Sequence, residues 1–264
     1  FLLEQGQNQK FSLVIDEFQE FININESIYS EMQNYWDRYR TITNINFIVS
    51  GSIYSLMTKI FQDRREPLFG RADVMMKLAP FTTSVLKEIM NDYKPDYTND
   101  ELLALYTYTG GVPKYVELLV DNKALTISKM IKYICQSDSP FIDEGRNLLI
   151  QEFGKKYGNY FSILDAISSG INTQSQIEAF MGEKSIGGQL SKLETVYEVI
   201  KKQRPIFAKE GSQTVRYEMS DNFLRFWFRY IERNRALIEL GNYEGLSKLI
   251  CDDYPTYSGK TLEV

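Results

Sequence analysis

Two adjacent carboxylates, Asp16 and Glu17, are the side chains of this chain whose types and placement best suit chemistry. They directly follow residues 11–15 (Phe-Ser-Leu-Val-Ile), a mostly apolar run typical of a strand buried on both faces of a parallel sheet. The carboxyl end of such a strand lies at the rim where α/β proteins bind ligands. One carboxylate could hold a Mg²⁺ ion there while the other polarises an attacking water.

This arrangement has the form of a Walker B element, the acidic strand end of a P-loop NTPase. The alternative is a buried strand that ends in a solvated acidic turn, because short apolar strings followed by Asp-Glu also recur by chance. Neighbouring motifs are needed to separate the two interpretations.

Two nearby motifs favour the Walker B interpretation. A second apolar run, residues 46–50, ends in Ser50-Gly51-Ser52, and either serine could contact a γ-phosphate or the attacking water. Arg71 follows a glycine hinge in Leu68-Phe69-Gly70-Arg71 and could neutralise phosphoryl charge on a neighbouring subunit. The alternatives are a plain turn after a strand and a surface arginine in a loop.

Composition excludes several function classes. The 264 residues suffice for two or three domains, and a net charge of −5 gives the whole chain no nucleic-acid signature. Histidine is absent, which excludes histidine catalysis and the common zinc sites. Cys135 and Cys251 lack metal-ligand spacing and indicate a reducing, cytoplasmic location. No apolar run approaches the ~18 residues that span a bilayer, so no membrane partner is expected.

The pattern of the first 82 residues predicts an α/β core. Strands are expected at 11–15, 46–50 and 73–78, with helices over 26–40 and 53–61 between them. Strands that alternate with helices imply a parallel sheet. From 83 to 154 the pattern becomes helical, with helices expected at 84–90, 99–107, 114–120, 124–137 and 143–154.

Within the helical region, Gly110-Gly111-Val112-Pro113 separates two helices. One interpretation is a helix C-cap followed by a proline at the start of the next helix. The other is a backbone surface that packs against an adenine base.

Residues 155–220 have the element order of a winged helix. Helices are expected at 160–168, 173–180 and 185–196, and strands at 196–200 and 215–219. Residues 184–216 contain seven basic and three acidic side chains, about +4 locally, which suits phosphate contacts with double-stranded DNA. The candidate contacts are Lys184, Gln189, Lys192, Lys201, Lys202 and Arg204. A protein-interaction module is the alternative, since Gly187-Gly188 weakens a recognition helix. Residues 221–240 predict one long aromatic-rich helix in the last segment, 221–264.

Six motifs in this order together resemble one family, the archaeal-type ATPases, which are AAA+/STAND-related P-loop proteins. They are residues 11–19 (FSLVIDEFQ), 47–52 (FIVSGS), 68–71 (LFGR), 78–81 (LAPF), 110–115 (GGVPKY) and 220–230 (SDNFLRFWFRY). The resemblance implies a P-loop ATPase core, an α-helical lid and a winged helix, often followed by a restriction-endonuclease-like domain.

The resemblance also assigns roles. Asp16 would hold Mg²⁺, Glu17 would activate water, and Ser50 or Ser52 would sense the γ-phosphate of ATP. Arg71 would be the arginine finger, which implies a homo-oligomer, and Gly111 and Pro113 would match the lid's G-x-P element. The leading hypothesis is therefore an ATP-binding and hydrolysing switch protein whose winged helix contacts DNA or a partner. The rival is a non-enzymatic winged-helix regulator, DNA-binding or dimerising, built on a degenerate ATPase scaffold.

The sequence departs from the family pattern in one important respect. It contains no G-x-x-x-x-G-K-[ST] phosphate loop. We expect that loop upstream of residue 1 and a nuclease-like domain, with Glu263 in its first helix, beyond the end. The sheet is then incomplete at its N-terminus, and strands 46–50 and 73–78 would each expose an edge. The chain alone should bind nucleotide poorly and hydrolyse nothing.

Overall fold

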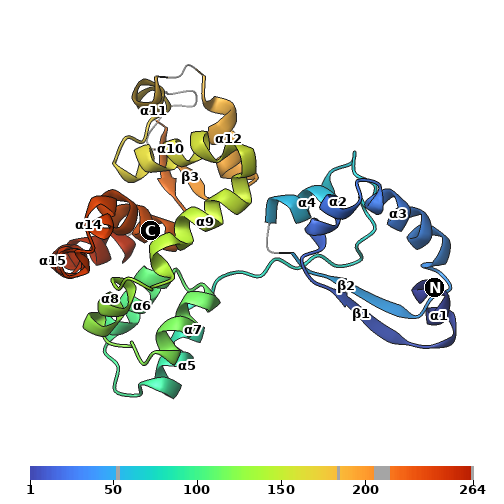
Figure 1. Ribbon diagram of the computed structural model, residues 1–264, viewed down its shortest axis with the longest axis horizontal. Helices are drawn as coiled ribbons and strands as arrows, with labels where there is room; N and C mark the ends of the chain where they lie inside the picture. Colours follow the sequence, from blue (N-terminus) through green and yellow to red (C-terminus); the bar gives the residue numbers. More distant parts are fainter. Residues whose placement is uncertain (52–53, 183–184, 205–214, 263–264) are drawn as a thin grey trace. The chain divides into compact units, whose positions relative to one another are not determined.

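The computed structural model describes residues 1–51, 54–182, 185–204 and 215–262. The chain divides into two compact units, residues 1–77 and residues 78–264 (Figure 1). The division lies five residues before the predicted boundary at residue 82. The finer partition of residues 83–264 into lid, winged helix and last segment stays a prediction. Each unit is described by itself below.

Unit 1 is built around a parallel pair of strands, β1 (Phe11–Ile15) and β2 (Ile45–Val49), paired in register from Phe11↔Ile45 to Ile15↔Val49. The crossover between them contains the short 3₁₀ turn η1 (Phe18–Glu20), α2 (Phe21–Ile24) and the longer α3 (Ile28–Tyr39). Helix α1 (Leu2–Asn8) precedes the pair and α4 (Tyr54–Gln62) follows it. The predicted strands 11–15 and 46–50 and the helices over 26–40 and 53–61 are thus confirmed to within two residues.

The core of unit 1 is small and lies on one face of the strands. Phe18 is completely buried and contacts the rings of Phe21, Tyr29, Phe47 and Phe61. On the other face Val14 remains 62% exposed. The prediction that both faces of this strand are covered is therefore wrong for the described chain, because its helices pack against a single face.

The strand predicted at residues 73–78 is also wrong. These residues form no regular element, and Met76 is 80% exposed. A strand requires a hydrogen-bonded neighbour, and in the described part of unit 1 only β1 and β2 pair with each other. An apolar run with strand composition stays irregular without a partner.

Unit 2 begins with a group of helices, as predicted for residues 83–154. They are α5 (Thr83–Tyr93), α6 (Asn99–Thr109), α7 (Pro113–Asp121), α8 (Ile127–Ile134) and α9 (Phe141–Phe153). Threonines cap three of them: Thr82 accepts a hydrogen bond from Val85 N–H, and Thr98 and Thr126 serve α6 and α8. Helices α5 and α6 begin within one residue of the predicted starts at 84 and 99.

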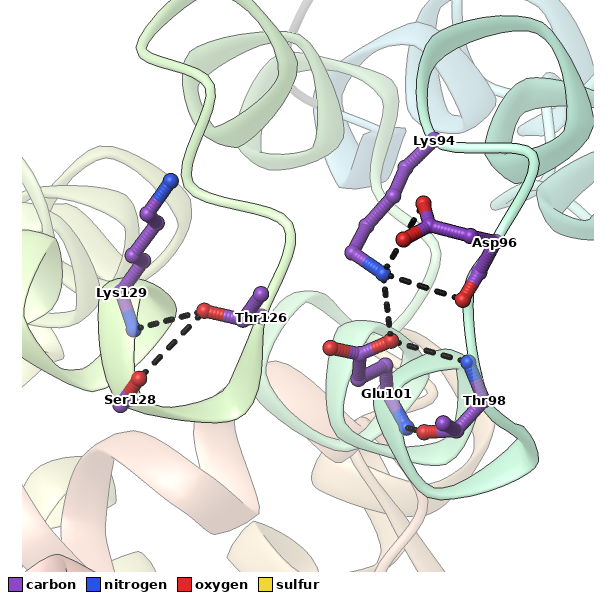
Figure 2. Close-up of polar contacts among 7 residues, drawn as sticks. All are labelled: Lys94, Asp96, Thr98, Glu101, Thr126, Ser128 and Lys129. Carbon is purple, nitrogen blue, oxygen red and sulfur yellow. Dashed lines mark hydrogen bonds and ion pairs between the residues drawn. The ribbon is translucent and has the colours of Figure 1, made fainter.

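The cap of α6 is the more elaborate of the two drawn in Figure 2. Thr98 Oγ1 accepts from Glu101 N–H, and Glu101 Oε2 accepts from Thr98 N–H, which together form a capping box. Lys94 Nζ adds an ion pair of 3.0 Å to the same carboxylate and a second pair to Asp96. At α8, Thr126 Oγ1 accepts only from Lys129 N–H among backbone donors of the described residues.

Three helices and an antiparallel strand pair follow. They are α10 (Tyr157–Ser168), α11 (Gln174–Met181), α12 (Gly187–Thr195), β3 (Ile200–Gln203) and β4 (Arg216–Met219). The pairing runs from Ile200↔Met219 to Gln203↔Arg216. The predicted start of the first strand at residue 196 is wrong by four residues. Glu198 has a left-handed backbone (φ 54°), and Val199 N–H still bonds to Leu193 O, so the chain turns there.

Residues 221–240 do not form the single regular helix that we predicted. They comprise α13 (Asn222–Phe226), a π turn η3 (Trp227–Ile231), a 3₁₀ turn η4 (Glu232–Asn234) and α14 (Arg235–Glu239). The last helix, α15 (Tyr243–Leu262), was not predicted. Pro255 lies inside it, and a proline normally argues against a continuous helix.

One continuous core joins the elements of unit 2, from Leu86 of α5 to Tyr257 of α15. Trp227 lies fully buried in this core and donates from its indole Nε1 to Ile142 O of α9. A Cβ at Gly145 would lie 2.2 Å from the Trp227 ring, so only glycine allows α9 to approach so closely. In the described parts of both units, no helix combines the length and apolarity needed to cross a bilayer.

Candidate functional site

The register of the two strands of unit 1 brings their carboxyl ends together. Ile15 and Val49 are partners, so Asp16 and Ser50 follow side by side at the same edge. The backbone fixes this arrangement: Ser50 N–H donates to Ile15 O, and Phe18 N–H donates to Ser50 O, both at 2.9 Å. Three polar side chains, those of Asp16, Glu17 and Ser50, are therefore presented at one exposed strand end.

Asp16 is held as an ionised carboxylate. Its Oδ1 accepts from Ser50 Oγ at 2.5 Å and from Glu17 N–H at 2.9 Å. These two hydrogen bonds, the serine's first, lower the pKa of Asp16 below its ordinary value. An exposed, ionised carboxylate is the hard oxygen ligand that Mg²⁺ prefers. The described residues contain no cluster of three or more acidic, histidine or cysteine side chains, so any Mg²⁺ here would need water or phosphate oxygens as further ligands.

Glu17 has an unusual backbone for a non-glycine residue. Its φ of 50° and ψ of 43° lie in the left-handed region, which costs about 1 kcal/mol or more for such a side chain. Strain of this kind persists where surrounding contacts enforce it. Here the flanking hydrogen bonds of Asp16 and Phe18 do so. The Glu17 side chain is exposed, and its Oε2 accepts from Gln19 Nε2 at 2.5 Å.

Of the two serines predicted as the γ-phosphate sensor, Ser50 lies at the strand end and Ser52 lies outside the described residues. Gly51, between them, is half-buried and closely packed. A Cβ on Gly51 would stand 2.2 Å from Gln19 Oε1.

The structure does not join Arg71 to this strand end through any hydrogen bond that it describes. Instead, Arg71 donates from Nε and Nη2 to the two carboxylate oxygens of Asp37 on α3, at 3.0 and 2.7 Å, and from Nη1 to Phe69 O. The preceding Gly70 has φ 67°, as a glycine hinge requires. The ion pair lowers the pKa of Asp37 through the guanidinium hydrogen bonds. A finger role for Arg71 stays a prediction.

In unit 2, the Gly110-Gly111-Val112-Pro113 segment is a helix junction. Gly110, in left-handed conformation, caps α6, and Pro113 is the first residue of α7, which confirms the capping interpretation. Gly111 (φ 75°) accepts from Phe81 N–H at 2.7 Å through its carbonyl, and a Cβ there would lie 2.4 Å from Phe81 O. A pocket of about 380 Å³ adjoins this junction, lined by Pro80, Phe81, Thr82, Thr83, Tyr106, Gly110, Ser220, Asp221 and Asn222. The adenine-facing role of Gly111 and Pro113 stays a prediction.

The described members of the predicted nucleic-acid contacts lie on α12, on β3 and, for Arg204, directly after β3. Lys192, Lys202 and Arg204 are exposed, whereas Gln189 and Lys201 are half-buried. Lys202 pairs with Glu194 at 2.5 Å, so part of the local positive charge is neutralised within the chain. Lys184 lies outside the described residues.

Comparison with known proteins finds a family match over the first part of the chain. Residues 2–119 match the model of an ATPase domain found predominantly in Archaea. The match supports an archaeal-type ATPase family for this part of the chain. An uncharacterized protein of Methanocaldococcus jannaschii is 32% identical over 253 residues, which is 95% of this chain and 55% of that relative. The chain therefore spans about half the length of this curated relative.

A solved structure supports the same fold. A Walker-type ATPase of Pyrococcus abyssi superposes with a TM-score of 0.60 at 17% identity, over 86% of this chain and 66% of that one. At this identity the likeness concerns the fold: a largely helical α/β protein with a small parallel sheet. The family match over residues 2–119 and the fold both support a protein of the P-loop ATPase kind.

Sequence reasoning missed two features of the sites. Gln19 entered the sequence-based prediction only as the last residue of the 11–19 motif. Its position two residues after Glu17 is the one sequence signal that indicates a contact with that carboxylate. The pocket beside Gly110 combines residues 80–83, 106, 110 and 220–222, and only the folded chain brings these together.

Proposed function

We propose that this chain is part of a protein that binds and hydrolyses ATP. The observation that carries the proposal is the convergence of Asp16, Glu17 and Ser50 at one parallel strand end. An archaeal-type ATPase family and a P-loop ATPase fold give the convergence its chemical meaning.

The roles of these residues follow from their chemistry. The ionised Asp16 would hold Mg²⁺, which neutralises charge on the phosphates when bound. Glu17 would orient the attacking water and accept its proton, and Ser50 would detect the γ-phosphate. Because Ser50 Oγ already donates to Asp16, a γ-phosphate oxygen would compete with the aspartate for this hydroxyl. That competition would link phosphate occupancy to the metal ligand.

The finer part of the proposal concerns the use of the ATPase. We infer an AAA+/STAND-type switch in which residues 83–154 act as a helical lid with Gly111 and Pro113 near the nucleotide base. Residues 155–220 would then act as a winged helix, an inference supported by the order of α10, α11, α12, β3 and β4. Arg71 would leave Asp37 to reach the nucleotide of a second copy in a homo-oligomer.

Nucleotide binding by the natural full-length protein tests the metal-ligand role of Asp16. We expect Asp16→Asn to abolish the Mg²⁺-dependent part of ATP affinity, measured by calorimetry with and without Mg²⁺. Asp73→Asn, the same change at an exposed position after the Arg71 loop, is the control and should leave both affinities unchanged. Equal Mg²⁺ dependence in Asp16→Asn and wild type would contradict the role.

Double-stranded DNA is the second candidate ligand, favoured by the exposed Lys192, Lys202 and Arg204. We expect the combined Lys201→Ala, Lys202→Ala and Arg204→Ala variant to reduce the slope of log affinity against log salt by up to about 3, because each phosphate contact contributes about 0.9. An unchanged slope would exclude β3 as the phosphate contact. DNA binding together with no ATP hydrolysis by the full-length protein would favour the non-enzymatic regulator.

A further inference from the structure

Gln19 is a buried polar residue beside the proposed site that the roles above do not use. Only 2% of it is exposed, and its amide lies between the ends of the two strands. Its Nε2 donates to Glu17 Oε2 at 2.5 Å. The carboxylate can only accept hydrogen bonds when ionised, so the amide nitrogen must face Glu17 and the amide oxygen must face the other way.

The amide oxygen of Gln19 is in an unfavourable position that needs explanation. Oε1 is buried and has no hydrogen-bond partner among the described residues. It packs on Gly51, at a position where any Cβ would be only 2.2 Å away. An unpaired buried polar atom costs about 1–3 kcal/mol, and an apolar side chain of the same shape would avoid this cost.

The backbone of Gln19 is fixed as firmly as its side chain. The Tyr29 hydroxyl bonds to both Phe18 O (3.0 Å) and Gln19 O (3.2 Å), and Tyr29 is itself buried. The backbone of Gln19 is therefore held by Tyr29 in the core, and its side-chain amide contacts the Glu17 carboxylate. The amide oxygen packs against Gly51, which lies two residues after the end of β2.

We propose that Gln19 is a positioning residue that sets the orientation of the Glu17 carboxylate relative to the end of β2. This inference rests on the proposed function, in which Glu17 orients water. The amide of Gln19 holds one carboxylate oxygen and so fixes the direction in which the Glu17 carboxylate faces. Gly51 fits this arrangement because a Cβ at that position would lie 2.2 Å from Gln19 Oε1.

Turnover by the natural full-length protein gives the first test. Gln19→Met keeps the volume of the side chain but removes the donor. We expect kcat to fall about 10- to 100-fold, as misplacement of a reacting group does, with KM for ATP and the affinity for ADP unchanged. Gln33→Met, the same change at a half-buried position of α3, is the control and should retain wild-type kcat. A wild-type kcat in Gln19→Met, whatever its effect on melting temperature, would overturn the inference.

Dependence on Glu17 separates positioning from a merely structural role. If Gln19 acts through Glu17, then Gln19→Met should change the single-turnover rate less than twofold once Glu17→Gln is present. A Gln19→Met effect of the same size in both backgrounds would overturn the inference.

A readout independent of activity tests the packing on Gly51. Gly51→Ala should lower the melting temperature of this chain, because its Cβ collides with Gln19 Oε1, and the loss should shrink by more than half when Gln19→Ala removes that atom. Met57, the other neighbour of the new Cβ, is flexible and can move aside. Equal losses in both backgrounds would contradict the proposed geometry.

Failure of the inference and failure of the proposed function give different results. A full-length protein without ATP hydrolysis, or one whose hydrolysis survives Glu17→Gln, would refute the proposed function and the inference with it. Hydrolysis that requires Glu17 but ignores Gln19→Met would refute the inference alone.

Discussion

The two units of this protein differ in the size of their buried cores, and the proposed site lies in the unit with the smaller core. Unit 1 presents Asp16, Glu17 and Ser50 on a core in which Phe18 is the one fully buried apolar side chain among the described residues, and it leaves Val14 of the opposite face exposed. Unit 2 has a continuous core from α5 to α15 around Trp227. The contrast teaches that the proposed site lies in the less buried unit, where local hydrogen bonds rather than extensive packing hold its geometry.

The largest effect should come from the core of unit 2. Trp227→Ala removes a fully buried indole and its hydrogen bond to Ile142 O, and we expect a loss of about 3–5 kcal/mol in the unfolding free energy of unit 2. The chain has one tryptophan per unit, so Trp36 remains as a fluorescence reporter of unit 1. Denaturant unfolding followed by far-ultraviolet circular dichroism and by Trp36 fluorescence should show the helical transition shifted and the Trp36 transition unmoved. A parallel shift of both would show that the units unfold together.

The corresponding change in unit 1 should have a slightly smaller effect but a greater consequence. Phe18→Ala leaves a cavity among Phe21, Tyr29, Phe47 and Phe61, and we expect a loss of about 3 kcal/mol. With so small a core, unit 1 should unfold at or near room temperature while α5–α15 stay folded, as amide hydrogen exchange would show. Val14→Ala, on the exposed face, is the control and should change stability by less than about 0.5 kcal/mol. Protected amides throughout β1 and β2 in Phe18→Ala would contradict the expected unfolding of unit 1.

The two units should also respond to opposite ends of the pH range. In unit 1, hydrogen bonds from Arg65 lower the pKa of Asp63 to about 2, and partners also lower those of Asp16 and Asp37. A lowered acid pKa contributes stability that is present above the unfolded value near 4 and is lost as pH falls toward 2. Unit 1 should therefore melt first under acid.

In unit 2, burial raises the pKa of Cys135 to about 12 and that of Tyr254 to about 12. A raised pKa of a neutral acid contributes stability that is complete below the unfolded value, near 9 for the thiol, and is lost as pH rises through 12. Unit 2 should weaken between pH 9 and 12, and Cys135→Ala should reduce that slope. Melting curves at pH 3, 7 and 10.5 check the order, and an acid-labile unit 2 with a stable unit 1 would contradict it.

The smallest effects should come from the helix caps of unit 2. Thr98→Ala breaks the capping box of α6, and we expect a loss of about 1 kcal/mol (Figure 2). Thr126→Ala removes one backbone hydrogen bond at α8, and we expect about 0.5 kcal/mol. Paired melting experiments on these matched threonine variants test the ranking, and equal losses would show that the Glu101 and Lys94 contacts add nothing.

What the sequence could predict follows the same division. Local patterns were enough for β1, β2 and most helices, because apolar periodicity and capping residues act over a few positions. They also placed Asp16, Glu17 and Ser50, since parallel strands end at a common edge. Residues 73–78 failed because strand composition does not supply a strand partner.

Other features depended on long-range packing. Helix α15 contains Pro255, and its core contacts through Leu246, Ile250 and Tyr254 outweigh one lost backbone hydrogen bond. The close packing of Trp227 depends on Gly145, 82 positions earlier in the chain, which no local pattern reveals. The role of Gln19 likewise depends on its contact with Gly51 of the other strand.

The central claim is that the strand end formed by Asp16, Glu17 and Ser50 is the hydrolytic part of an ATPase. The most direct test is steady-state phosphate release from ATP by the natural full-length protein and its Glu17→Gln variant, with Glu20→Gln as the matched control three residues along the chain. We predict that Glu17→Gln lowers turnover at least about 100-fold while ATP affinity is retained, and that Glu20→Gln leaves turnover unchanged. Wild-type turnover in Glu17→Gln would contradict the account.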